Sequence, residues 1–352
     1  MKLVLPGCCC LAIGGFILLS ACNGVSKQSQ QASKGKDSVS ASNIDTIGPK
    51  IQFFTKRIAA NPRDADSYWR RGILEAALKQ YEPAKQDYDK AIKIDSNKAD
   101  YYYMLADLDF ITGHTRDCKD VFEKCISVDP KNTDALIRLG ELYFYVKKYP
   151  EAIEYLDKAL KINPHLARPY FEKGMIFLEK KDTAKAISSM QTAVEQDTKY
   201  FDAYIELGLV FTRKGKSIAI DYFNDAINTR PGNVEAYYDK AMFYQQGQDY
   251  DDAIKTYREL LQVDSTYKYA LYNMGVIYYI YKQDYSQAVQ YFSKAINSDN
   301  AYALAYYGRG NSYEQLDRYE DALRDFSAAK QYDPGFTEAA DAIRDVRTKM
   351  HK

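Results

Sequence analysis

The chain has 352 residues, of which 48 are Lys or Arg and 48 are Asp or Glu, so its formal net charge at neutral pH is zero. A chain with no basic excess lacks the electrostatic footprint of a nucleic-acid-binding protein, and this balance also argues against a strongly anionic surface as its main partner. A chain of this length ordinarily holds two or three domains, but the pattern along this sequence indicates a different organisation.

The first residues have the pattern of an export leader. Met1-Lys2 supplies a short positive start, and Leu3 to Leu19 carries no charge. An apolar run of about 17 residues is at the lower limit for a spanning helix, so residues 1–21 are interpreted as a targeting segment outside the fold. The run ends in Leu19-Ser20-Ala21-Cys22, which resembles the lipobox of bacterial lipoproteins. The resemblance implies cleavage before Cys22 and lipid attachment to this cysteine. A plain signal peptide and an uncleaved anchor are the alternatives.

Residues 22–48 are rich in Ser, Gln, Lys and Gly and carry almost nothing apolar, which predicts a flexible tether with a reach of roughly 30 Å. Several acyl chains, at about 0.8 kcal/mol per buried CH₂, hold a protein on a membrane where one would not. Asn23 stands where an aspartate would resemble the inner-membrane retention signal of enterobacterial lipoproteins. We therefore expect a lipid-anchored protein of the bacterial cell envelope, with the outer membrane facing the periplasm favoured over the inner membrane.

From Gly72 onward the sequence repeats with a period of 34 residues. The first ladder of small residues consists of Gly72, Ala106, Gly140, Gly174, Gly208, Ala241, Gly275 and Gly310. The second consists of Ala84, Cys118, Ala152, Ala186, Ala219, Ala253, Ala288 and Ala322. The third ladder, of large apolar residues, consists of Tyr88, Phe122, Leu156, Met190, Phe223, Tyr257, Phe292 and Phe326. The ladders shift together through one short and one long step. They define eight units: 65–98, 99–132, 133–166, 167–200, 201–233, 234–267, 268–302 and 303–336.

The unit 133–166 indicates what each repeat builds. Its apolar residues fall on two helical stripes separated by a turn at 147–150, and Pro164 ends the second helix. The stripes hold Leu136, Leu139, Gly140 and Tyr143, then Ala152, Leu156 and Ala159. Neither helix can bury its stripe alone, so helix pairs must stack on neighbouring pairs.

The spacing of Leu139-Gly140, Tyr143, Ala152, Leu156 and Pro164 resembles the tetratricopeptide repeat, or TPR. The resemblance implies an all-α fold, a right-handed α-solenoid of antiparallel helix pairs over residues 65–336. Residues 49–64 are predicted to form a capping half-repeat, and residues 337–352 a capping helix. The short repeat 201–233 and the long repeat 268–302 are expected to change length in the turn between their helices, where such changes are tolerated.

Candidates for chemistry are few. Cys118 and Cys125 lie seven residues apart on one predicted helix, so their Cα atoms are about 10.5 Å apart along the axis. A disulfide needs less than about 7 Å, so both are interpreted as core residues. His114, His165 and His351 have no ligand partners at metal-binding spacing. The sequence predicts no metal site, no cofactor and no catalytic residues. An enzyme of unrecognised type is the remote alternative.

Positions 2, 5, 9 and 12 of each first helix are predicted to line the concave surface, where TPR proteins usually bind partners. Aromatic residues and Met make strong, adaptable contacts with partner chains. The predicted groove residues are Trp69, Tyr103, Phe110, Phe144, Phe171, Met175, Tyr238, Met242, Tyr272, Tyr279 and Tyr307. The alternative is that the aromatic residues at position 5 pack between repeats. Position 2 is mostly acidic, and interaction with the helix dipole explains this better than an acidic lip for a basic partner.

These features together predict a membrane-tethered, non-enzymatic scaffold that binds a protein or peptide partner along the groove, without nucleic acid. The alternative is a structural spacer or self-assembling module that works through its ends or its convex face. A homo-oligomer would favour that alternative.

Overall fold

The computed structural model describes residues 41–351, and the regular structure in this range is entirely helical. The predicted leader 1–21, the lipid attachment at Cys22 and the tether up to residue 40 lie outside the described residues. The described residues divide into two compact units between Glu179 and Lys180. Within the described range, we find no helix that combines the length and apolar character needed to span a bilayer.

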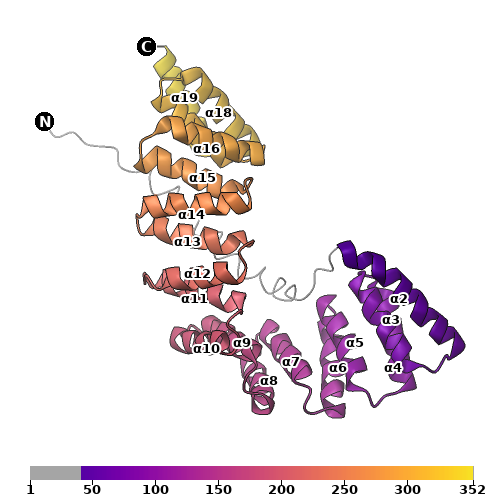
Figure 1. The fold of residues 1–352 in the computed structure, drawn as a ribbon. Helices are drawn as coiled ribbons and strands as arrows, with labels where there is room; N and C mark the ends of the chain where they lie inside the picture. Colours follow the sequence, from indigo (N-terminus) through magenta and orange to yellow (C-terminus); the bar gives the residue numbers. More distant parts are fainter. Residues whose placement is uncertain (1–40, 352) are drawn as a thin grey trace. The chain divides into compact units, whose positions relative to one another are not determined.

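The first unit begins with one additional helix, continues with three helix pairs and ends on the first helix of repeat four (Figure 1). Its helices are α2 (Ala41–Ala60), α3 (Ala65–Ala77), α4 (Tyr81–Ile94), α5 (Ala99–Ile111), α6 (Thr115–Val128), α7 (Thr133–Tyr145), α8 (Tyr149–Ile162) and α9 (Ala167–Glu179).

In the second unit the helices follow one another in chain order along a single stack, from magenta-pink through orange to yellow in Figure 1. They are α10 (Thr183–Gln196), α11 (Phe201–Arg213), α12 (Ala219–Thr229), α13 (Val234–Gln246), α14 (Tyr250–Val263), α15 (Lys268–Val276), the π-helical turn η2 (Ile277–Tyr281), α16 (Tyr285–Ser298), α17 (Ala303–Gln315), α18 (Tyr319–Tyr332) and α19 (Thr337–Met350). Both units therefore have the α-solenoid architecture expected from the period.

The first and third ladders meet inside the repeats, which explains why the first ladder has only Gly and Ala. A Cβ added at Gly72 would lie 2.7 Å from the ring of Tyr88, and one added at Gly310 would lie 2.7 Å from the ring of Phe326. Every residue of the second and third ladders is buried. The two helices of a repeat approach so closely at the first ladder that its positions cannot hold a large side chain.

The turn between the two helices also recurs. It contains a residue with positive φ, which is stabilised by two backbone bonds of the Schellman type. In repeat three, the Lys147 amide donates to the Phe144 carbonyl at 2.9 Å, and the Lys148 amide donates to the Tyr143 carbonyl at 2.8 Å. The residues with positive φ are Lys79, Gly113, Lys147, Lys181, Gly215, Gln248, Gln283 and Asp317. Only two are glycine, so the helix–turn–helix geometry holds the others in a conformation that a Cβ disfavours.

Helix α2 begins at Ala41, eight residues before the predicted half-repeat. It therefore takes in part of the segment expected to be tether. Ile47 gives a physical reason, because its side chain is buried and draws the preceding turn onto the fold. Pro49 lies inside this helix, where it cannot donate a backbone hydrogen bond.

The expectation that both irregular repeats change length in the turn is wrong for repeat seven. Its extra residue is accommodated in η2, where the Lys282 amide donates to the Ile277 carbonyl at 3.1 Å. A one-residue π expansion keeps both Ile277 and Ala288 buried. In repeat five the missing residue shortens the second helix, since α12 has 11 residues and starts only at Ala219.

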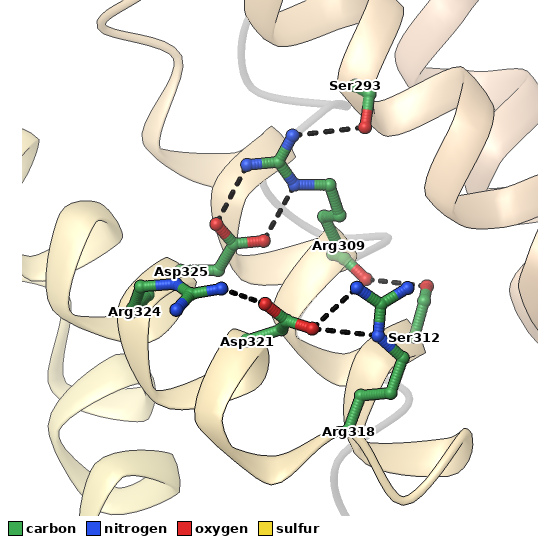
Figure 2. Close-up of polar contacts among 8 residues, drawn as sticks. Ser293, Arg309, Ser312, Arg318, Asp321, Arg324 and Asp325 are labelled. Carbon is green, nitrogen blue, oxygen red and sulfur yellow. Dashed lines mark hydrogen bonds and ion pairs between the residues drawn. The ribbon is translucent and has the colours of Figure 1, made fainter.

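The last repeat has a charged clamp between its two helices. Arg309 of α17 donates to both carboxylate oxygens of Asp325 in α18 at 2.7 and 2.8 Å, and to the Ser293 hydroxyl of the preceding helix at 3.0 Å (Figure 2). The same arrangement, with the same spacing of 16 residues, recurs in the first repeat through Thr55, Arg71 and Asp87. Four interior repeats have an apolar residue at the arginine position: Leu105, Leu139, Leu207 and Met274.

Candidate partner-binding groove

Within each unit the first helices of consecutive repeats contact one another. The contacting pairs are α3 with α5, α5 with α7, α7 with α9, α11 with α13, and α15 with α17. Residues three or four apart lie on one side of a helix, so positions 2, 5, 6, 9 and 12 of these helices form one surface. We call this surface the first-helix face. It contains all the predicted groove residues.

The aromatic residues at position 5 pack against the third ladder of their own repeat. The ring centroids of Tyr103 and Phe122 are 6.1 Å apart, and those of Tyr272 and Phe292 are 5.6 Å apart. The same contact joins Tyr238 to Tyr257 and Tyr307 to Phe326. These aromatic residues therefore hold the two helices together, in addition to any contact with a partner.

Position 5 also links consecutive repeats. The ring of Trp69 lies 5.8 Å from the ring of Tyr101 in the next repeat, and the hydroxyl of Tyr238 accepts a bond of 3.3 Å from Asn273. The inter-repeat packing that the sequence left as an alternative is present at both residues. Phe171 and Tyr272 are only 6% and 5% exposed, so little of either side chain is left for a partner.

Positions 9 and 12 are more open. Phe110 lies under the guanidinium of Arg138, with 5.5 Å from that group to the ring centroid. Phe144 and Tyr279 each contact a tyrosine of the following helix in a tilted arrangement, at 6.1 and 5.6 Å between ring centroids. These side chains are half-buried, as are Met175 and Met242, and Met242 accepts a bond of 3.1 Å from the Tyr257 hydroxyl.

The first unit has a network of ion pairs on this face that crosses three repeats. Arg138 at position 6 lies 2.7 Å from Asp107 and 3.1 Å from Glu141. Arg168 at position 2 of the next repeat donates to Glu141 at 2.8 Å. Burial raises the pKa of the neighbouring Glu172 to about 8; Glu141 acts in the same direction, and Arg168 and Arg138 oppose it. On this face the first unit thus supplies cations for Asp107 and Glu141.

The second unit has carboxylates at the same position 6 without such cations. Burial, with Glu235 and Asp202 nearby, raises the pKa of Glu206 to about 7, against the opposing effect of Arg213. Burial, with Glu235 and Glu206 nearby, raises the pKa of Asp239 to about 8. This row was not predicted from the sequence, because only positions 2, 5, 9 and 12 were expected to line the concave surface. The signal was available, since position 6 holds an acidic residue in three consecutive repeats.

The structure also places the metal-ligating residue types and the two cysteines of the folded part. No group of three His, Cys, Asp or Glu residues within the described part of the chain could hold a metal ion. Cys118 and Cys125 are buried on α6, as predicted for core residues, and burial raises the pKa of both thiols to about 12.

Stacked helix pairs, with first helices in contact within each unit, define a repeat scaffold for protein–protein interaction. Models described as tetratricopeptide repeat match residues 65–98, 99–132, 133–166, 167–200, 269–302 and 303–336, and one described as TPR repeat matches 241–280. Together they cover more than half of the chain, so the protein belongs to the tetratricopeptide repeat family. Repeat five, whose second helix is shortened, lies outside these matches.

One solved structure supports this fold, and two others are similar in sequence over about half of the chain. The C-terminal part of a TPR repeat-containing protein from Cytophaga hutchinsonii is 20% identical, with 68% of this chain and 99% of that chain covered and a TM-score of 0.59. YrrB, described as a TPR protein with an unusual peptide-binding site, is 28% identical over 52% of this chain and 95% of that chain, with a TM-score of 0.41. MamA is 27% identical over 46% and 95%, with a TM-score of 0.41. No curated protein matches the sequence significantly.

Proposed function

We propose that the protein is a membrane-tethered scaffold of the bacterial cell envelope that binds a segment of a partner protein along its first-helix face. The observation that carries this proposal is the row of half-buried aromatic and Met side chains at positions 9 and 12. Such side chains already have one side fixed by packing, so a partner gains apolar contact while little further side-chain entropy is lost.

The binding half of the proposal is tested with adjacent residues on the same helices. In one variant, Phe110→Ser and Phe144→Ser alter position 12; in the matched control, Ile111→Ser and Tyr145→Ser alter position 13, where the side chains are 47% and 56% exposed. Each variant, expressed in its natural host, is used to recover partner proteins, and circular dichroism checks that the helices are intact. We expect partner recovery to fall only for the position-12 variant. Loss only in the control would instead favour the structural module that works outside the groove.

The tether half of the proposal rests on the lipobox-like Leu19-Ser20-Ala21-Cys22 sequence. Lipid attached to Cys22 would hold the chain on a membrane, and the segment after it would set the distance of the repeats from the surface. The test is fractionation of cells that express the wild type or Cys22→Ala, with density separation of inner and outer membranes. We expect the wild type in the outer-membrane fraction. Equal membrane association of the two proteins would refute lipid anchoring.

A further inference from the structure

The first-helix face of the second unit contains two carboxylates that have no partner of opposite charge in contact. Glu206 in α11 and Asp239 in α13 occupy the same position in consecutive repeats. Both are half-buried, and among residues 41–351 neither accepts a hydrogen bond or lies within ion-pair distance of a cation. The nearby Asp202 is paired with Arg230 at 3.7 Å. When they are ionised, the two partly desolvated carboxylates therefore have no cation in contact in the free chain, and Arg213 acts on Glu206 only at longer range. The ionised form is unfavourable unless a ligand supplies a cation.

Tyrosine rings lie near Asp239. The rings of Tyr238, Tyr267 and Tyr269 meet edge to face, with centroids 5.6 to 6.5 Å apart. Asp239 contributes to the raised pKa of both Tyr238 and Tyr267, which places its charge close to this cluster. Aromatic faces accept the alkyl stem of Lys or Arg, and they attract the cationic head through the ring quadrupole.

The two units differ in the charge of the residues at positions 2 and 6 of their first helices. In the first unit Arg138 occupies position 6 and Arg168 position 2, and together they neutralise Asp107 and Glu141. The second unit has acidic residues at both of these positions in repeats five and six. Helix dipoles explain acidic residues in a first turn, but position 6 lies beyond that turn. Because this face of the second unit lacks these cations, a ligand that binds there is expected to carry positive charge.

We propose that the first-helix face of α11, α13 and α15 binds a partner segment that carries Lys or Arg, with one cationic side chain between Glu206 and Asp239 and its stem against Tyr238 and Tyr267. This inference rests on the proposed function, because it names the chemistry of the segment bound by that face. Electrostatic complementarity of this kind selects the partner and aids its association.

The probe is a short fluorescent peptide of alternating lysine and alanine, titrated onto the full-length chain and followed by anisotropy. The test variant is Glu206→Gln/Asp239→Asn, which keeps the shape of both side chains. The matched control is Asp221→Asn/Asp252→Asn, which removes the same charge from exposed sites on α12 and α14. We expect about tenfold weaker binding for the test variant and a change of less than about twofold for the control. The wild type should bind the probe more tightly as pH rises from about 6 to about 9, because Glu206 and Asp239 ionise in that range.

Equal affinity of the test and control variants would overturn the inference, as would equally tight binding of a glutamate–alanine peptide. The outcome is separable from that of the proposed function. If the natural partner is lost with the Phe110 and Phe144 substitutions but retained with Glu206→Gln/Asp239→Asn, the groove stands and its basic ligand is refuted. If the partner is retained by both variants, the groove itself is refuted.

Discussion

Replacing Glu206 and Asp239 by their amides should stabilise the fold, and the gain should depend on pH. Both carboxyl groups have a higher pKa in the folded chain than when unfolded: about 7 against 4.5 for Glu206, and about 8 against 3.8 for Asp239. A group with this shift binds a proton more tightly in the folded state, so it favours folding at low pH. Between about pH 4 and pH 8 the wild type loses that contribution, whereas the amides do not titrate.

The size of the effect follows from the shift. One pKa unit corresponds to about 1.4 kcal/mol, so the shift of Glu206 alone sets a ceiling of about 3 kcal/mol on its contribution. Both side chains are only half-buried, and water that reaches them reduces this ceiling. For Glu206→Gln/Asp239→Asn we therefore expect a gain in unfolding free energy on the order of 2 kcal/mol at pH 9 relative to the gain at pH 4.

The assay is urea unfolding of the full-length chain, followed by circular dichroism from about pH 4 to pH 9. Urea is preferred to guanidinium because a salt would screen the charges that matter. The control Asp221→Asn/Asp252→Asn removes two solvent-exposed carboxylates, so its difference from the wild type should change less with pH than that of the test variant. A stability difference for the test variant that does not change with pH would refute the claim that these carboxylates are desolvated.

Three further outcomes follow from the packing. Gly310→Ala should destabilise the chain by about 1–3 kcal/mol in urea unfolding, because the added Cβ overlaps the ring of Phe326; a gain from helix propensity alone would contradict this. Lys147→Gly should stabilise by about 0.5–1 kcal/mol, because glycine adopts φ 60° without a Cβ penalty, and a loss would show that the turn tolerates lysine for another reason. Cys118 and Cys125 should react with a thiol reagent at pH 8 only after unfolding, and rapid labelling of either of these two residues in the folded chain, located by peptide mapping, would refute their burial.

Much of the fold could be predicted from the sequence because each repeat encodes the same packing contact. A small residue in the first ladder faces a large one in the third, as at Gly72 and Tyr88, and the period carries this pairing along the chain. Local changes were harder to predict. The extra residue of repeat seven lies in η2, because a π-helical turn at this place keeps Ile277 buried. The spacing of the ladders shows that one residue has been added, but it does not show whether the first helix or the turn contains it.

The candidate groove was predicted less completely than the fold. Helical spacing placed the position-5 aromatic residues on the correct helices, but it did not separate the side of each ring that packs from the side that is exposed. Tyr272 shows the limit, because its position matches that of Trp69 while the rings of Phe292 and Tyr302 enclose it. The row at position 6 needed the structure for another reason. Whether Glu206 has a partner depends on residues in neighbouring repeats, which no single period describes.

The arginine–aspartate clamp has a consequence for how such an array can grow. Arg309 donates to Asp325 and also to the Ser293 hydroxyl of the preceding helix. A copy of this repeat at another place in the array would therefore need a serine or threonine 16 residues before its arginine. Without that hydroxyl, a guanidinium N–H would be left unpaired beneath another layer of helices. We therefore expect gene duplication to lengthen the chain by copying its interior repeats, while the first and last repeats remain at the two ends of the array.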